Sequence, residues 1–247
     1  MRKSLGVAVA LFASLTGVLV PASPAQATGI LAGKVIGIDP GHNGRNYTDP
    51  SFLNQQVWNG REWENCDTTG TQTRGGYTEH AFNWAIANYL AQQLIRAGAK
   101  VVWTRTSDTG IGPCVDRRAR LLNYGHPNLS IDIHADGGPT TGRGFAILLP
   151  VADGPNNGVI KGSLHFAYYL RSRMVGMAGM PVSTYDGVNG FAYRSDLAGL
   201  NLTTQPKVLI ECGNMRNSTD ASLLGSKTWQ LKAANAMVSA IVKTLVG

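Results

Sequence analysis

Short apolar runs alternate with longer segments of helical periodicity along this chain of 247 residues. The apolar runs predict buried strands at residues 34–39, 100–105, 129–134, 144–149 and 207–210. Apolar positions at three-to-four spacing predict helices at residues 78–97, 115–124, 164–177, 218–224 and 226–245. Strands that alternate with helices favour an α/β fold. We expect a single-domain sandwich of a largely parallel mixed sheet with helices on both faces.

Two segments, 45–76 and 182–204, show neither period. The first is rich in Asn, Gly and Thr, and it carries Tyr47, Trp58 and Trp63. A loop of this length in a compact domain is usually functional or mobile. Its aromatic side chains could stack on sugar rings or pin the loop to the body of the domain, and we favour pinning.

The N-terminus has the pattern of a secretory signal peptide. Arg2 and Lys3 precede an apolar run at 5–20, and Ala25-Gln26-Ala27 matches a small-residue cleavage site. We expect residues 1–27 to be removed and residues 28–247 to form the catalytic domain, secreted to the periplasm or cell-wall space. An uncleaved anchor is the alternative, although the run is short for a membrane span. After cleavage we expect no stable membrane insertion.

The formal net charge of the whole chain is +7, and loss of Arg2 and Lys3 with the signal peptide lowers it to +5. A basic surface keeps a protein soluble or attracts it to an anionic polymer outside the cell. The sequence shows no cluster of Lys and Arg and no nucleic-acid motif, so no nucleic-acid partner is expected. We expect a monomer.

An exported chain can form disulfides, and this one has three cysteines. Cys66 and Cys114 both lie in polar loops and form the natural pair. Cys212 ends an apolar strand and is expected to be a buried free thiol. The alternative is three free cysteines.

Two histidines follow predicted strands. His42 comes after Asp39-Pro40-Gly41, and His134 comes after the run 129–133. The carboxyl ends of parallel strands meet at one edge of a sheet, where ligands bind. Zinc hydrolases use three nitrogen or oxygen ligands and leave one position open. The candidates for the third ligand are Glu79, His80, Asp136, Glu64 and Glu211.

A metal-dependent hydrolase also needs a base. Glu211 follows the apolar run 208–210 at the same edge of the sheet. Glu79 opens a helix, where a carboxylate also favours the helix dipole. Spacing alone does not decide which of the two is the ligand and which is the base. Asp39 is either a partner of His42 or a residue that forms the turn.

Several motifs, taken in their order along the chain, resemble those of the Amidase_3 family of zinc-dependent N-acetylmuramoyl-L-alanine amidases. The resemblance is to single-domain members of the mycobacterial type in particular. The matching segments are residues 39–44, Glu79 with the helix that ends before 98–101, residues 104–108, Arg118 with Asn123, residues 130–136, and residues 208–215. Leu122 replaces a usual Ala. Residues 130–136 hold one residue more than the family motif, Asp132 or Ile133, which leaves the strand register open. Cys212 and Asn214 stand where Thr and Phe are common.

The resemblance implies His42, Glu79 and His134 as zinc ligands and Glu211 as the catalytic acid and base. It also implies hydrolysis of the amide between N-acetylmuramic acid and L-alanine in peptidoglycan, during cell-wall turnover or daughter-cell separation. Zinc would polarise the carbonyl and acidify the attacking water. Two alternatives are a zinc peptidase that cuts within the stem peptide and a non-catalytic wall-binding protein. The presence of both histidines and both glutamates argues against the second.

Overall fold

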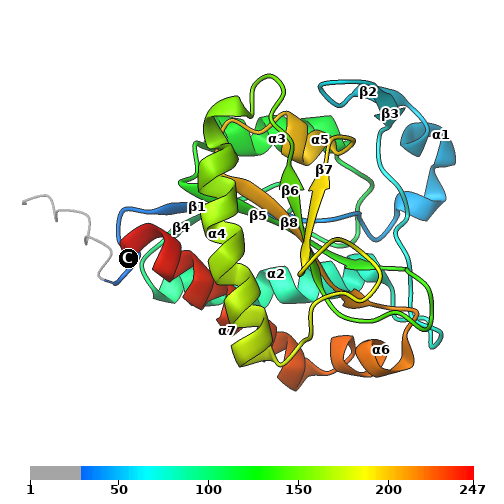
Figure 1. Cartoon of the computed structure of the whole chain (residues 1–247). Coiled ribbons are helices and arrows are strands. Elements are labelled where there is room, and N and C mark those ends of the chain that lie inside the picture. Colours follow the sequence, from blue (N-terminus) through cyan, green and yellow to red (C-terminus); the bar gives the residue numbers. More distant parts are fainter. Residues whose placement is uncertain (1–28) are drawn as a thin grey trace, which may run out of the picture.

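A six-stranded mixed sheet forms the centre of the computed structural model, which describes residues 29–247 (Figure 1). The predicted signal peptide, residues 1–27, lies outside the described residues. The strand order is β4-β1-β5-β8-β6-β7. The strands are β1 (Val35–Pro40), β4 (Lys100–Trp103), β5 (Leu129–Asp136), β6 (Ala146–Pro150), β7 (Phe191–Arg194) and β8 (Lys207–Asn214). Neighbours are parallel except for the antiparallel pair β6–β8, which confirms the expected largely parallel sheet.

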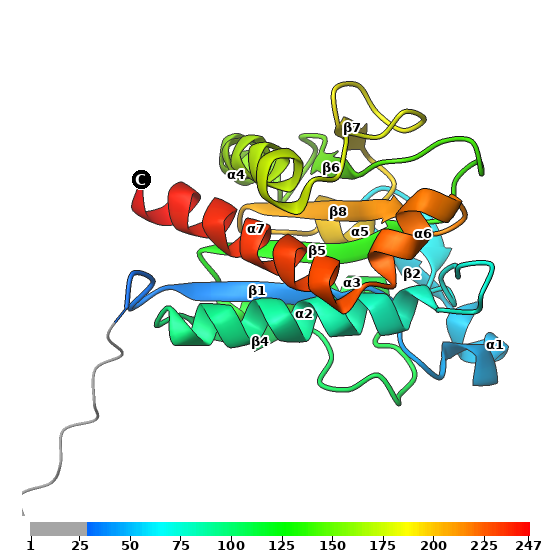
Figure 2. The same ribbon diagram turned by 90° about the horizontal axis from the view of Figure 1, so that it is seen from below.

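Helices cover both faces of the sheet, as expected (Figure 2). One face carries α2 (Glu79–Arg96), α4 (Ile160–Arg173) and α7 (Lys227–Val246). The other face carries α3 (Val115–Gly125) and the short α5 (Ala198–Asn201). The remaining α-helices of the described part are α1 (Pro50–Leu53) and α6 (Ser218–Leu224).

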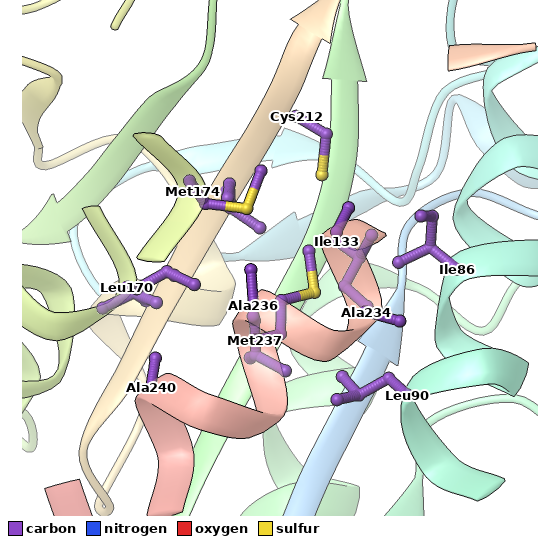
Figure 3. Packing of buried hydrophobic residues seen from close by; sticks show 14 of the residues in the cluster. Ile86, Leu90, Ile133, Leu170, Met174, Cys212, Ala234, Ala236, Met237 and Ala240 are labelled. Atoms are coloured by element: carbon purple, nitrogen blue, oxygen red, sulfur yellow. The ribbon is translucent and has the colours of Figure 1, made fainter. Parts of the chain in front are cut away.

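The main core fills the space between the sheet and α2, α4 and α7. Leu90, Ile133 and Met237 bring apolar side chains to it from three elements (Figure 3). Cys212 is buried there as a free thiol, as predicted. The opposite face has only a small apolar cluster, made of Ala146, Leu148, Ala192, Leu200 and Leu209. That face leaves room for the buried charges described below.

The segment 45–76 contains a two-stranded hairpin of β2 (Gln56–Trp58) and β3 (Trp63–Asn65), which the sequence pattern did not predict. The second aperiodic segment contains β7. The prediction that the aromatic residues pin the loop is wrong, because Tyr47, Trp58 and Trp63 are all exposed. Polar groups hold the hairpin instead. The Arg61 guanidinium donates to Val151 O at 2.9 Å, and Ala198 N–H donates to Glu64 Oε1 at 3.2 Å.

A disulfide joins Cys66 to Cys114, as expected, across 48 positions of the sequence. Cys66 directly follows β3, and Cys114 directly precedes α3. The bond therefore ties the chain just after the hairpin to the start of α3.

The sequence predicts Thr78 and Ser218 as the N-caps of two helices, and neither side chain makes a capping hydrogen bond in the structure. Thr78 precedes α2, but its side chain makes no capping hydrogen bond. Asn217, rather than Ser218, caps α6, because its side chain accepts from Thr219 N–H and Asp220 N–H. Side-chain caps of this kind satisfy amide groups that have no partner within the helix.

The register of β5 settles the question raised by the longer motif at 130–136. Pairing with β1 is unbroken from Leu129 to Ile133, and pairing with β8 is unbroken from Ser130 to His134. The irregularity falls between His134 and Asp136. Asp132 therefore occupies a regular strand position, two residues before His134 and on the same face.

Among the helices of residues 29–247, none is both long and apolar enough to cross a membrane.

Candidate metal centre

His42, Glu79 and His134 meet at the carboxyl edge of the sheet. One nitrogen or oxygen of each lies within 4.8 Å of the others. Glu79 Oε1 is 3.3 Å from His42 Nε2 and 2.8 Å from His134 Nδ1. Three elements bring them together: the turn after β1, where His42 has a left-handed φ of 59°, the first residue of α2, and β5.

The packing around this group leaves no room for side chains at two glycines. A Cβ on Gly41 would lie 2.1 Å from His134 Cε1. A Cβ on Gly70, which has a φ of +71°, would lie 2.7 Å from Glu79 Oε2 and from His42 Cδ2. Glycine at both positions lets the backbone press close against the three side chains.

The chemistry of the group fits a metal cation. Two imidazoles and one carboxylate are a donor set that zinc sites use when one position stays open. Burial opposes protonation of His42, but Glu79 and Asp67 raise its pKa to about 9. Burial also opposes protonation of His134, but Asp132 and Glu79 outweigh it and raise the pKa of His134 well above its usual range. The negative potential that favours a proton on these rings also favours a bound cation.

Carboxylates lie beside the ring nitrogens that face away from this group. His42 Nδ1 is 3.1 Å from Asp67 Oδ1 and 3.2 Å from Thr68 O. His134 Nε2 is 3.3 Å from Asp132 Oδ1, a buried oxygen that has no other hydrogen-bond partner within residues 29–247. A carboxylate on the outer nitrogen of an imidazole is typical of metal-ligating histidines.

Those two carboxylates are joined by a chain of buried opposite charges. Asp67 Oδ2 lies 3.1 Å from the Arg118 guanidinium, which is 3.0 Å from Asp39 Oδ1. The Lys207 ammonium lies 3.2 Å from Asp39 Oδ2 and 3.6 Å from Asp132 Oδ2. Burial alone would raise the pKa of Asp39, but Lys207 and Arg118 hold it well below its usual range. The chain of contacts runs from one histidine to the other.

Asp39 is therefore not the partner of His42, and that alternative is wrong. Its carboxylate accepts from Thr104 and from Arg118, and it also binds Lys207. Asp67 takes the place beside His42. This role of Asp67 was not predicted from the sequence, because Asp67 lies in an aperiodic segment with no motif around it. Its position next to Cys66 was the one available signal.

Glu211 lies in β8, paired in register with His134 of β5. Its Oε2 is buried and has no hydrogen-bond partner among the described residues. Burial raises the pKa of Glu211 to about 8, His134 opposes the shift, and the Glu79 and Asp136 carboxylates add to it. A carboxyl group that exchanges a proton near neutral pH suits general acid and base catalysis.

The remaining ligand candidates are not part of the group. His80 Nδ1 pairs with Asp108 Oδ2 at 2.8 Å. Glu64 belongs to the hairpin and accepts from Ala198 N–H. Asp136 follows the irregularity in β5. None of these three residues belongs to the group of His42, Glu79 and His134.

A cavity of about 530 Å³ opens beside the candidate metal ligands. Its polar wall includes Glu211, Arg194 and the hairpin residues Glu64 and Asn65. Its apolar wall includes Val115, Leu148, Leu197, Ala198 and Leu209. The cavity can therefore take a substrate that is partly polar and partly apolar.

Comparison with known proteins relates this site to one enzyme family. Residues 36–243 match the family model described as N-acetylmuramoyl-L-alanine amidase. The chain is 41% identical over 233 residues to an N-acetylmuramoyl-L-alanine amidase of Mycobacterium tuberculosis, covering 94% of this chain and 93% of the relative.

Two solved structures are also similar. The N-acetylmuramyl-L-alanine amidase Ami1 of Mycobacterium smegmatis has a TM-score of 0.82 and 40% identity, covering 87% of this chain and 98% of its own. Ami1 of Mycobacterium abscessus has a TM-score of 0.81 and 42% identity, covering 87% of this chain and 99% of its own.

Proposed function

Because the chain belongs to the N-acetylmuramoyl-L-alanine amidase family, we propose that it hydrolyses the amide between N-acetylmuramic acid and L-alanine in peptidoglycan, using zinc. The observation that carries this proposal is the convergence of His42, Glu79 and His134 beside the buried Glu211. We assign residues 28–247 to the catalytic domain and residues 1–27 to a signal peptide. The site of action is then the wall space, in wall turnover or daughter-cell separation, and the protein acts as a monomer.

His42 Nε2, His134 Nδ1 and a Glu79 oxygen are the proposed zinc ligands, since these atoms face one another. Bound zinc would supply Lewis-acid polarisation of the scissile carbonyl and acidification of the attacking water. Asp67 and Asp132 keep the protons of the two imidazoles on the outer nitrogens. The inner nitrogens then present lone pairs to the cation.

Glu211 is the proposed acid and base. Its unpartnered Oε2 takes a proton from the attacking water as the water oxygen bonds to the amide carbon. It then gives a proton to the leaving nitrogen as the carbon–nitrogen bond breaks. The products are the carboxylate of the lactyl group and a peptide with a free N-terminal L-alanine.

Mass spectrometry of a defined muropeptide, one sugar with its stem, tests this function. The wild-type protein with zinc is expected to release the intact stem. Glu211→Gln keeps the size of the side chain and removes its basicity, so turnover should fall about 10²–10⁴-fold while zinc stays bound. His134→Ala is expected to lose zinc as well as activity.

Each contrary outcome would point to a different function of the protein or to a different role of Glu211. Cleavage inside the stem with the lactyl amide intact would replace the amidase with a zinc peptidase. Wall binding without any cleavage would replace it with a non-catalytic wall protein. If Glu211→Gln lost as much zinc as His134→Ala does, Glu211 would be a ligand rather than the base.

A further inference from the structure

The outward face of the β2–β3 hairpin exposes two indole rings. Trp58 and Trp63 are directly opposite each other in the strand pairing, with ring centroids 5.7 Å apart. Trp58 is 45% exposed and Trp63 is 65% exposed. Adjacent tryptophans with this much surface in water are unusual for a monomer and mark an interaction surface.

The same face carries two carboxamides. Side chains alternate along a strand, so Gln56 and Asn65, the next pair on this side, share a face with the tryptophans. Both are exposed, and Gln56 Nε2 donates to Asn65 Oδ1 at 2.6 Å. Asn65 also lines the catalytic cavity. The four residues, here called the hairpin platform, therefore begin at the edge of that cavity.

The opposite face and the turn of the hairpin fix its orientation. Asn59 Oδ1 closes the turn by accepting from Arg61 N–H at 2.9 Å and Glu62 N–H at 3.0 Å. Asn59 Nδ2 donates to Asp196 O at 3.3 Å, and Glu64 Oε1 accepts from Ala198 N–H. A platform held this way loses little conformational entropy when a ligand binds.

We propose that the hairpin platform binds the glycan strand of peptidoglycan beside the muramic acid whose amide is cleaved. This inference rests on the proposed function. Indole rings offer flat apolar faces for the C–H faces of sugar rings. Carboxamides both donate and accept, which matches sugar hydroxyl and acetamido groups. The platform itself carries no charge, whereas a membrane-surface site typically sets Lys or Arg beside its aromatic residues.

Binding to peptide-free glycan strands of alternating N-acetylglucosamine and N-acetylmuramic acid tests the proposal directly. We expect wild-type tryptophan fluorescence to change on titration, and the Trp58→Ala, Trp63→Ala double variant to bind at least about tenfold more weakly. Its KM should rise more for polymeric peptidoglycan than for a fragment with a single sugar. Trp63→Phe keeps an aromatic face and should bind more strongly than Trp63→Ala.

Tyr124→Ala is the matched control, since Tyr124 is 86% exposed near the end of α3 and does not line the cavity. It should leave glycan binding unchanged. Equal glycan binding by the wild type and the folded Trp63→Ala variant would overturn the proposal. So would tryptophan-dependent binding to phosphatidylglycerol vesicles in place of glycan. Failure of the wild type to cleave the fragment would refute the proposed function, which the glycan titration does not measure.

Discussion

At the scale of single residues, the outer nitrogens of the two candidate ligand histidines lie beside carboxylates, Asp67 and Asp132. Asp67 lies 3.1 Å from His42 Nδ1 and 3.1 Å from the buried Arg118 guanidinium. This double contact fixes the carboxylate where it can accept a hydrogen bond from a proton held on His42 Nδ1. If a cation binds at Nε2, this contact keeps the remaining imidazole proton on Nδ1 and leaves the Nε2 lone pair for the cation.

Asp67→Asn should therefore weaken zinc affinity about 10–100-fold, because an amide accepts more weakly than a carboxylate and pairs poorly with Arg118. Asp132→Asn is expected to act on His134 in the same way. Competition with a chelator measures the affinity. Asp116→Asn is the control, since Asp116 is also buried and pairs with Arg120 at 2.6 Å but contacts no candidate ligand. An unchanged zinc affinity in Asp67→Asn would contradict this role.

The residues of the candidate site differ in how far the sequence alone predicts them. His42 follows β1, and His134 and Glu211 lie in the second halves of β5 and β8, so the apolar runs that predict these strands also predict that the three residues share one edge of the sheet. Only the family resemblance favoured Glu79 over the other candidates for the third ligand. A glutamate at a helix start is already explained by its favourable interaction with the helix dipole. Asp67 and its contact with His42 depend on how an aperiodic segment folds back over the site. No local spacing encodes that path.

At the scale of elements, long regular segments were predictable, as was the four-residue β4 with its run of Val and Trp, whereas the other strands of three or four residues were not. Strands β1, β5 and β8 are buried apolar runs, and α2 and α7 are long enough to show their period. The strands β2, β3 and β7 are three or four residues long, which is too short for a period to be recognised. Their conformation is set by pairing with a neighbour, and that information is not local.

The hairpin makes stability depend on pH through Glu64. Burial raises the pKa of this half-buried carboxyl from its ordinary value of 4.5 to about 7. The folded state then binds the proton more tightly than the unfolded state does. The contribution of Glu64 to stability is complete below pH 4.5 and is lost as the pH rises through about 7.

Glu64→Gln should accordingly be more stable than the wild type at pH 8, by on the order of 1 kcal/mol after allowance for solvent around the group. The difference should vanish below about pH 4.5. The neutral amide still has an oxygen to accept from Ala198 N–H. Urea unfolding at both pH values measures the effect, and Glu62→Gln, at an exposed position of the same hairpin, is the control. A destabilised Glu64→Gln at pH 8 would refute the argument.

At the scale of the whole molecule, the two faces of the sheet have different tasks. The apolar core against α2, α4 and α7 is large and lies away from the charged chain. The opposite face has a small apolar cluster, and Asp39, Asp132 and Lys207 are buried beneath the cavity. We expect the first face to hold the fold by itself, which lets the site contain unfavourable groups such as the Glu211 oxygen that has no hydrogen-bond partner among the described residues.

Removal of zinc should therefore lower thermal stability without unfolding the chain. The proposed ligands join the turn after β1, the start of α2 and β5, so a bound cation favours the native state alone. Zinc at about 100 times its dissociation constant contributes about 2.7 kcal/mol. For a domain of this size that corresponds to a rise in Tm of roughly 5–10 °C.

Circular dichroism of the chelator-treated protein should show native secondary structure, and calorimetry with added zinc should show the rise. Glu211→Gln is expected to gain as much Tm from zinc as the wild type, since it keeps all three proposed ligands. The His42→Ala, His134→Ala double variant should gain almost none, because Glu79 alone binds zinc weakly. An apoprotein without secondary structure would mean that the apolar face does not hold the fold by itself. A full rise in the double variant would place the zinc elsewhere in the molecule.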